Sequence, residues 1–345
     1  MTRILGQDDA LAQLRAAMDG GALHHAWLIA GPEGTGKGSF ARIAALRMLA
    51  EAIDGDGLPP GFAVPPQHPA AALFAAGSHP DFRLLERLPA DKKERGLPRA
   101  EWPADIKLAR NIAIDQVRDL IAGFAMVPSL SRRRVVIVDA IDDLERNAAN
   151  ALLKSLEEPP AGTVFLLVSH APGRLLPTIR SRCRLLRFQA LEVATIGQLL
   201  DMLLPEASPA ERTALTEVGQ GSIGRALRFA GLDIAAIDAR LVAIARSGDF
   251  DNAERIALGR LVSGKAAQPR YEAFLARVPS FVAANARERS GSALAEAIGA
   301  WEAARQLAAA ALPMNLEAAT VAFEMGGIVA RLAPSAPLQK PGAMR

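Results

Sequence analysis

The chain has 345 residues, of which half are apolar and only 5% are aromatic, and its formal net charge is +3. This length allows two or three domains, and the composition is that of a globular, helix-rich protein. The single cysteine, Cys183, excludes a disulfide framework and a zinc site built from cysteines. The N-terminus lacks the apolar core of a signal peptide, and no uninterrupted apolar run reaches about 18 residues. We therefore expect a cytoplasmic protein without a membrane span.

Apolar stretches at 26–30, 82–85, 135–138 and 163–168 predict strands, and residues 182–188 are expected to form a final short strand. Helical patterns at 7–19, 40–49 and 147–156, and one that begins at 112, alternate with them. Strands without polar alternation indicate a parallel sheet covered on both faces, which is an α/β fold. After Gln189 the strand patterns stop. Small helices are expected at 191–232, and an Ala-rich helical pattern follows from about 233 to 334.

The most informative stretch is Gly31–Ser39, which reads GPEGTGKGS between the first predicted strand and the following helix. This order of strand, glycine-rich turn and helix is the context of a phosphate-binding loop. Backbone N–H groups and the helix N-terminus attract phosphate there, and Lys37 supplies a cation. The candidate nucleotide-binding residues of the loop are Gly31, Gly34, Gly36, Lys37 and Ser39.

Two positions depart from the pattern of a hydrolysing site. Gly38 stands where Ser or Thr would bind Mg²⁺, and Ser39 cannot replace it because one residue turns a helix by about 100°. Asp139 closes a predicted strand as a candidate magnesium-directing carboxylate. Ala140 follows it, where a Glu would orient the attacking water. We expect no required cofactor and no hydrolysis, while weak binding of ATP or ADP with Mg²⁺ stays open.

Several charged residues allow two interpretations. Arg182 either caps a helix at the surface or acts in trans as an arginine finger on a neighbour's γ-phosphate. Arg225 could reach a nucleotide from the small helical region.

Cys183 is interpreted as a buried structural thiol rather than one activated by nearby arginines. Asp142 and Asp143 are expected at a solvated helix start. The arginines at 132–134, 180, 182, 184 and 187 form either a solvated basic face or contacts to nucleic-acid phosphates.

Six stretches together resemble the AAA+ clamp-loader subunits of bacterial DNA polymerase III. They are Gly6-Gln7, 25–28, 78–81, 147–160, 180–184 and 221–227. The block 147–160, running from Asn147 to two prolines, is highly specific in combination with Ser181-Arg182-Cys183. The resemblance covers residues 4–230.

The resemblance implies three domains: an AAA+ P-loop domain at 1–188, a helical lid at 189–235 and a helical collar at 236–345. The collar would join the chain to gamma/tau motor subunits and a delta subunit in a hetero-pentamer. Such a complex opens a sliding clamp and loads it onto primed DNA during replication.

Within the family, Gly38, Asp139-Ala140 and the lack of cysteines around 52–80 favour the delta-prime branch. The resemblance implies that this branch does not run the ATP cycle, so we expect the chain to have no catalytic activity of its own in the polymerase holoenzyme. The missing cysteines exclude the family's zinc site from this chain, and no metal site is expected. The branch's Ser-Arg-Cys arginine, here Arg182, completes the neighbour's ATP site. The alternative is an active ATP-hydrolysing gamma/tau-like motor or another AAA+ remodeller.

Overall fold

The computed structural model describes residues 4–334, except 22, 56, 98–100, 104–105 and 265–266. Residues 335–345, the end of the expected collar, therefore lie outside the described part. The chain forms two compact units, Met1–Thr195 and Ile196–Arg345. Each unit is described by itself below. The division into three domains stays a prediction.

The first unit is built on a five-stranded parallel sheet in the order β2-β3-β4-β1-β5. Its strands are β1 (Ala26–Ala30), β2 (Phe82–Glu86), β3 (Arg134–Asp139), β4 (Thr163–Ser169) and β5 (Arg184–Arg187). All residues of β1 and β4 are buried because both faces of the sheet are covered. The expected α/β fold class is confirmed. The last strand was predicted too long, since Arg182 and Cys183 lie in the turn before β5.

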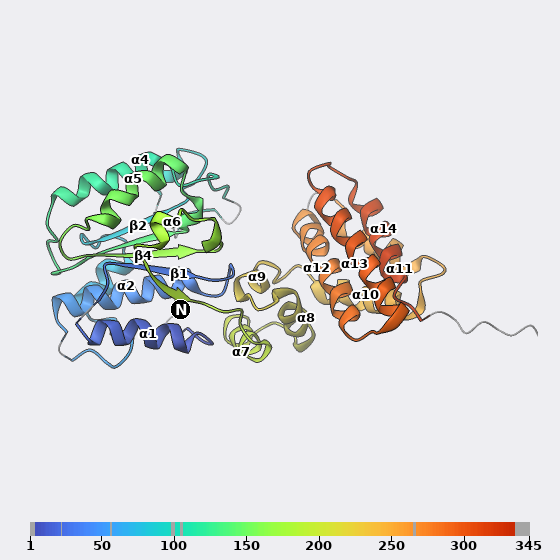
Figure 1. Ribbon diagram of the computed structural model, residues 1–345. Coiled ribbons are helices and arrows are strands. Elements are labelled where there is room, and N and C mark those ends of the chain that lie inside the picture. The colour runs from blue at the N-terminus through green and yellow to red at the C-terminus, as the bar shows by residue number, and fades with distance from the viewer. Residues whose placement is uncertain are drawn as a thin grey trace, which may run out of the picture. The chain divides into compact units, whose positions relative to one another are not determined.

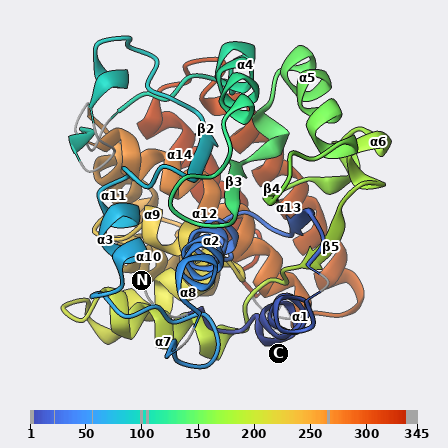
Figure 2. The same ribbon diagram turned by 90° about the vertical axis from the view of Figure 1, so that its left-hand side faces the viewer.

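Helices cover the sheet on both faces (Figures 1 and 2). One face carries α1 (Asp8–Asp19), α2 (Lys37–Ile53) and α3 (Pro69–Ala75), and the other carries α4 (Ile114–Ala122), α5 (Arg146–Glu157) and α6 (Pro177–Arg180). Alternate residues of a strand point to opposite faces, so Trp27 and Ile29 enter one core while Leu28 and Ala30 enter the other. Short 3-10 turns are η1 (Glu94–Gly96), η3 (Gly123–Ala125), η4 (Ile141–Asp143) and η5 (Pro172–Arg174).

The second unit contains only helices among the residues that the structure describes. They are α7 (Val193–Leu203), which begins at the boundary, α8 (Pro209–Gly219), α9 (Ile223–Arg228), α10 (Ile234–Ser247), α11 (Ala253–Val262), α12 (Gln268–Arg287), α13 (Gly291–Ala311) and α14 (Ala318–Ala330). In the described residues, no helix combines the length and the apolar character that crossing a bilayer requires.

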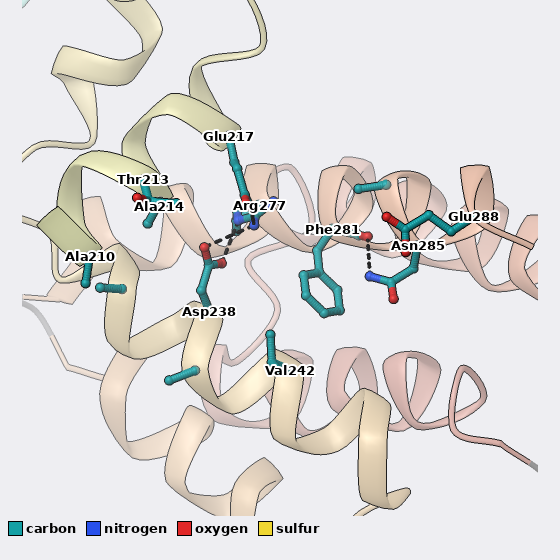
Figure 3. Close-up of a pocket in the computed structure, with 13 residues that line it drawn as sticks. Ala210, Thr213, Ala214, Glu217, Asp238, Val242, Arg277, Phe281, Asn285 and Glu288 are labelled. Carbon is teal, nitrogen blue, oxygen red and sulfur yellow. Dashed lines mark hydrogen bonds and ion pairs between the residues drawn. The ribbon is translucent and has the colours of Figure 1, made fainter. Parts of the chain in front are cut away.

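Arg277 joins three helices of the second unit, as Figure 3 shows. Its side chain is only 3% exposed, and its Nε and Nη2 donate to the carboxylate of Asp238 at 2.6 and 3.0 Å. Nη2 also lies 2.5 Å from Glu217 Oε2. The group borders a cavity of about 530 Å³ lined in part by Val242 and Phe281. One buried guanidinium thus ties α8 to α10 and α12.

Candidate functional site

The carboxyl ends of the parallel strands bring the predicted site residues to one edge of the sheet, where α/β proteins place ligands. β1 leads into the glycine-rich loop, and β2, β3 and β4 end at Glu86, Asp139 and Ser169. The strand register sets Glu86 beside Asp139 and Ala30 beside Ser169. The loop residues 31–39 and Asp139 therefore lie at the same edge of the sheet, while their binding of a nucleotide stays a prediction.

The path of the loop depends on glycine at its first position. A Cβ atom on Gly31 would lie 2.1 Å from the carbonyl oxygen of Phe188, so any larger residue would displace the segment after β5. Gly36 precedes α2 with a φ of 95°, a conformation that favours glycine. Lys37 then begins the helix. The strand, turn and helix predicted from the sequence are confirmed.

Lys37 points back into its own loop. Its Nζ donates to the carbonyl oxygens of Gly31, at 2.7 Å, and of Pro32, and the residue is 2% exposed. Burial lowers the pKa of Lys37 to about 8, although the carboxylates of Asp139, Asp142 and Glu33 oppose this shift. A phosphate that entered the loop would have to draw the ammonium away from these carbonyl oxygens.

Asp139 forms an ion pair with Arg42, which is not among the residues predicted from the sequence. Arg42 Nη1 lies 3.0 Å from Asp139 Oδ2, and Arg42 Nη2 lies 3.2 Å from Glu86 Oε2. Nη1 also donates to the Gly38 carbonyl oxygen at 3.2 Å. Two signals in the sequence could have found this group. Arg42 lies four residues after Gly38 on the same helical face, and Glu86 directly follows a predicted strand.

Asp142 differs from the expectation of a solvated helix start. It lies in the η4 turn, before α5 begins at Arg146, and accepts hydrogen bonds from Ser169 Oγ at 2.9 Å and from the His170 N–H at 2.5 Å. Asp143 pairs with Arg87 at 3.1 Å, while burial raises the pKa of Asp143. These contacts link the turn after β3 to the end of β4, which the local sequence does not reveal.

Arg182 contacts the block 147–160, the stretch that contributes with the Ser-Arg-Cys motif to the family resemblance. Its Nη2 lies 2.7 Å from Glu157 Oε1 at the end of α5, and its Nη1 donates to the Thr178 carbonyl oxygen at 2.8 Å. The Arg182 side chain is 34% exposed, and none of its described bonds reaches the loop at 31–39. Its role in trans stays a prediction. Burial raises the pKa of the neighbouring Cys183 thiol to about 12, which fits the structural interpretation.

The remaining predicted residues are placed as follows. Ser39 lies in the first turn of α2, where Gly38 and not Ser39 faces Asp139. Arg225 belongs to α9 in the second unit and donates to Gln220 Oε1 at 3.1 Å, so its contact with a nucleotide stays a prediction. Within the described part of the chain, no group of three or more His, Cys, Asp or Glu side chains could hold a metal ion.

The comparisons with known proteins point to one family. The model of the DNA polymerase III delta subunit matches residues 6–192. DNA polymerase III subunit delta' of Pseudomonas aeruginosa is 40% identical over 171 residues, covering 49% of this chain and 45% of that protein. Subunit tau of Salmonella typhimurium is 29% identical over 262 residues, covering 74% of this chain and 37% of that protein.

Subunit gamma/tau of Mycobacterium tuberculosis is 34% identical over 197 residues, covering 57% of this chain and 30% of that protein. The chain spans less than half the length of these relatives. The resemblance found in the sequence is confirmed, because the family model covers more than half of the chain. The chain belongs to the DNA polymerase III delta-subunit family and is similar to clamp-loader subunits of the delta-prime and tau/gamma types.

Proposed function

We propose that this chain takes the delta-prime role in a DNA polymerase III clamp loader. In this role it helps to load a sliding clamp onto primed DNA without hydrolysing ATP itself. Its partners are gamma/tau motor subunits and a delta subunit in a hetero-pentamer in the cytoplasm. The 40% identity to a delta' subunit supports this role over that of a motor.

The observation that carries the proposal is the contact between Arg42 and Asp139 beside Gly38. A hydrolysing site needs a hydroxyl and a free carboxylate around Mg²⁺ and a base to orient water. Here the hydroxyl is missing, Asp139 is paired with Arg42, and Ala140 replaces the base. Lys37 is engaged by its own loop. Nucleotide is therefore not required for the role, and any that binds the loop binds weakly.

The catalytic contribution that we assign is Arg182, acting on a neighbour's nucleotide. Its guanidinium is one-third exposed and oriented by Glu157, so it can be presented to another subunit in a fixed position. Arginine fingers of this kind contribute about 10³–10⁵-fold to turnover in related phosphoryl transfer.

ATP turnover by the purified full chain tests the non-hydrolysing role. We expect no turnover with Mg²⁺ above that of a Lys37→Ala variant, because the site lacks the groups that activate water. Turnover by the unaltered chain that Lys37→Ala abolishes would support the motor alternative instead.

A loader reconstituted with gamma/tau and delta subunits tests the finger. We expect Arg182→Ala to leave assembly intact and to lower turnover at the neighbouring site by about 10³-fold or more. Arg118→Ala is the matched control, because Arg118 is also an arginine paired with a carboxylate at the surface. If loader turnover is the same with both variants, Arg182 has no role in trans.

A further inference from the structure

Two carboxylates face the first turns of α2 at the carboxyl edge of the sheet. Glu86 and Asp139 end neighbouring strands and stand beside each other in register. The Arg42 guanidinium lies between them, 3.2 Å from Glu86 Oε2 and 3.0 Å from Asp139 Oδ2. Its Nη1 also reaches the Gly38 carbonyl oxygen. A single cation therefore bridges both strands and the start of the helix.

Gly38 provides the space in which this bridge forms. A Cβ atom at this position would lie 2.5 Å from Asp139 Oδ2 and 3.2 Å from Arg42 Nη1. Even a methyl group at this position would displace the Asp139 carboxylate from the position in which the Arg42 guanidinium holds it. The missing hydroxyl and the Arg42 bridge are thus two parts of one arrangement rather than independent losses.

The residues around Asp139 do not fit a magnesium ion. Mg²⁺ requires near-octahedral oxygen ligands at about 2.0–2.1 Å and usually keeps several waters. The oxygen that would serve it, Asp139 Oδ2, accepts from Arg42, and Gly38 offers no hydroxyl. Arginine keeps its charge at every physiological pH, so this counter-charge is permanent.

We infer that Arg42 is a built-in substitute for the divalent cation of this loop. The inference rests on the proposed non-hydrolysing role and deepens it, since it makes the site independent of Mg²⁺. Any phosphate group that the loop takes is then neutralised by Lys37 and Arg42 rather than by a metal.

Binding of Mn²⁺ alone to the full chain, followed by electron paramagnetic resonance, tests the inference, because Mn²⁺ shares the oxygen ligands of Mg²⁺. We expect the unaltered chain to show no Mn²⁺ binding that depends on Asp139. Arg42→Ala should bind Mn²⁺ at least about tenfold more tightly, the effect of one lost charge-assisted contact. The double variant Arg42→Ala with Asp139→Asn should lose this gain in Mn²⁺ affinity. The control variant Arg118→Ala should bind Mn²⁺ as weakly as the unaltered chain.

Unfolding of Gly38→Ser variants gives a second readout that needs no ligand. We expect Gly38→Ser to lower the urea midpoint in the unaltered background and to lower it much less in the Arg42→Ala background, because a freed Asp139 can turn aside. Equal shifts in the two backgrounds would overturn the coupling between Gly38 and Arg42.

Two results would overturn the inference that Arg42 takes the place of the divalent cation. One is Mn²⁺ binding by the unaltered chain that Asp139→Asn abolishes, and the other is an Arg42→Ala variant with no gain in Mn²⁺ affinity. Either result would leave the role of Arg182 in a neighbour's site untouched. Conversely, an inactive Arg182 finger in the reconstituted loader would leave the Mn²⁺ result standing.

Discussion

At the scale of single residues, Asp81 shows how one buried carboxylate fixes a loop. Its oxygens accept from the backbone N–H groups of Ser129, Leu130 and Ser131 at 2.7–2.9 Å, and the residue is 2% exposed. Burial raises the pKa of Asp81, but these hydrogen bonds outweigh it and hold the pKa below the ordinary 3.8. The motif Ser78-His79-Pro80-Asp81 thus stabilises the loop at 129–131 through its aspartate.

We predict that Asp81→Asn lowers the free energy of unfolding by about 1.5–3 kcal/mol, the worth of hydrogen bonds to a charged group. Because the folded pKa is depressed, this stability is present above the ordinary pKa and is lost as pH falls through the folded value. Urea unfolding at pH 7 and in acid measures it. Asp91→Asn, at an exposed loop carboxylate, is the control, and equal losses in both variants would contradict the prediction.

Lys37 also makes stability rise with pH, but in the alkaline range. Its folded pKa of about 8 lies below the ordinary 10.5, so between these values the unfolded chain binds more protons and stability rises with pH. We expect Lys37→Met to remove an increase of roughly 2–3 kcal/mol across this range. Urea unfolding at pH 7.5 and pH 10 measures the difference, with Lys93→Met as the exposed control. An unchanged slope in Lys37→Met would refute the prediction.

At the scale of elements, stretches far apart in the sequence meet through a single ion pair or through hydrogen bonds of one side chain. Glu157 at the end of α5 pairs with Arg182 in the turn after α6, so the block 147–160 and the Ser-Arg-Cys motif are in contact in the fold. Gln7, before α1, exchanges two hydrogen bonds with the backbone of Gln189 after β5. The first contact joins the end of α5 to the turn after α6, and the second joins the start of α1 to the segment after β5.

The junction of α8, α10 and α12 depends on Arg277 in the same way. Burial raises the pKa of Asp238, although Arg277 opposes the shift, and removing the guanidinium would leave this carboxylate buried without its cation. We expect Arg277→Leu to cost about 3–5 kcal/mol of stability, and Arg277→Leu with Asp238→Leu to recover much of it.

Thermal and urea unfolding of the full chain measure both Arg277 variants. Arg240→Leu is the control, because its pair with Glu254 is partly exposed and should be worth at most about 1 kcal/mol. A similar small loss for Arg277→Leu would show that the buried network does not hold these helices.

At the scale of the whole molecule, we expect the two compact units to have separate functions. The first unit carries the glycine-rich loop at 31–39 and Arg182, and the second unit is helical in its described residues. A cut at residue 235 would separate Glu217 from Asp238 and Arg277, so a truncation that tests assembly should follow the boundary at Thr195.

We predict that a fragment ending at Thr195 keeps the spectrum of a folded α/β protein but does not co-purify with the other loader subunits. The reason is that the collar, which is proposed to mediate assembly, is absent. Circular dichroism and co-purification measure the two properties, with the full-length Arg182→Ala chain as the control that assembles. Recovery of the fragment in a complete ring would contradict this assignment.

The sequence by itself determined the parallel sheet, the strand-loop-helix order around Lys37 and the family, because these depend on local periodicity and short motifs. It also placed Asp139 at the site from its position after a strand. Only the tertiary structure decided what Asp139 contacts. Arg42 lies 97 residues from Asp139 and 44 from Glu86, and Arg277 lies 60 from Glu217. Local patterns can single out candidates such as Arg42 and Glu86, but only folding brings such distant side chains within bonding distance.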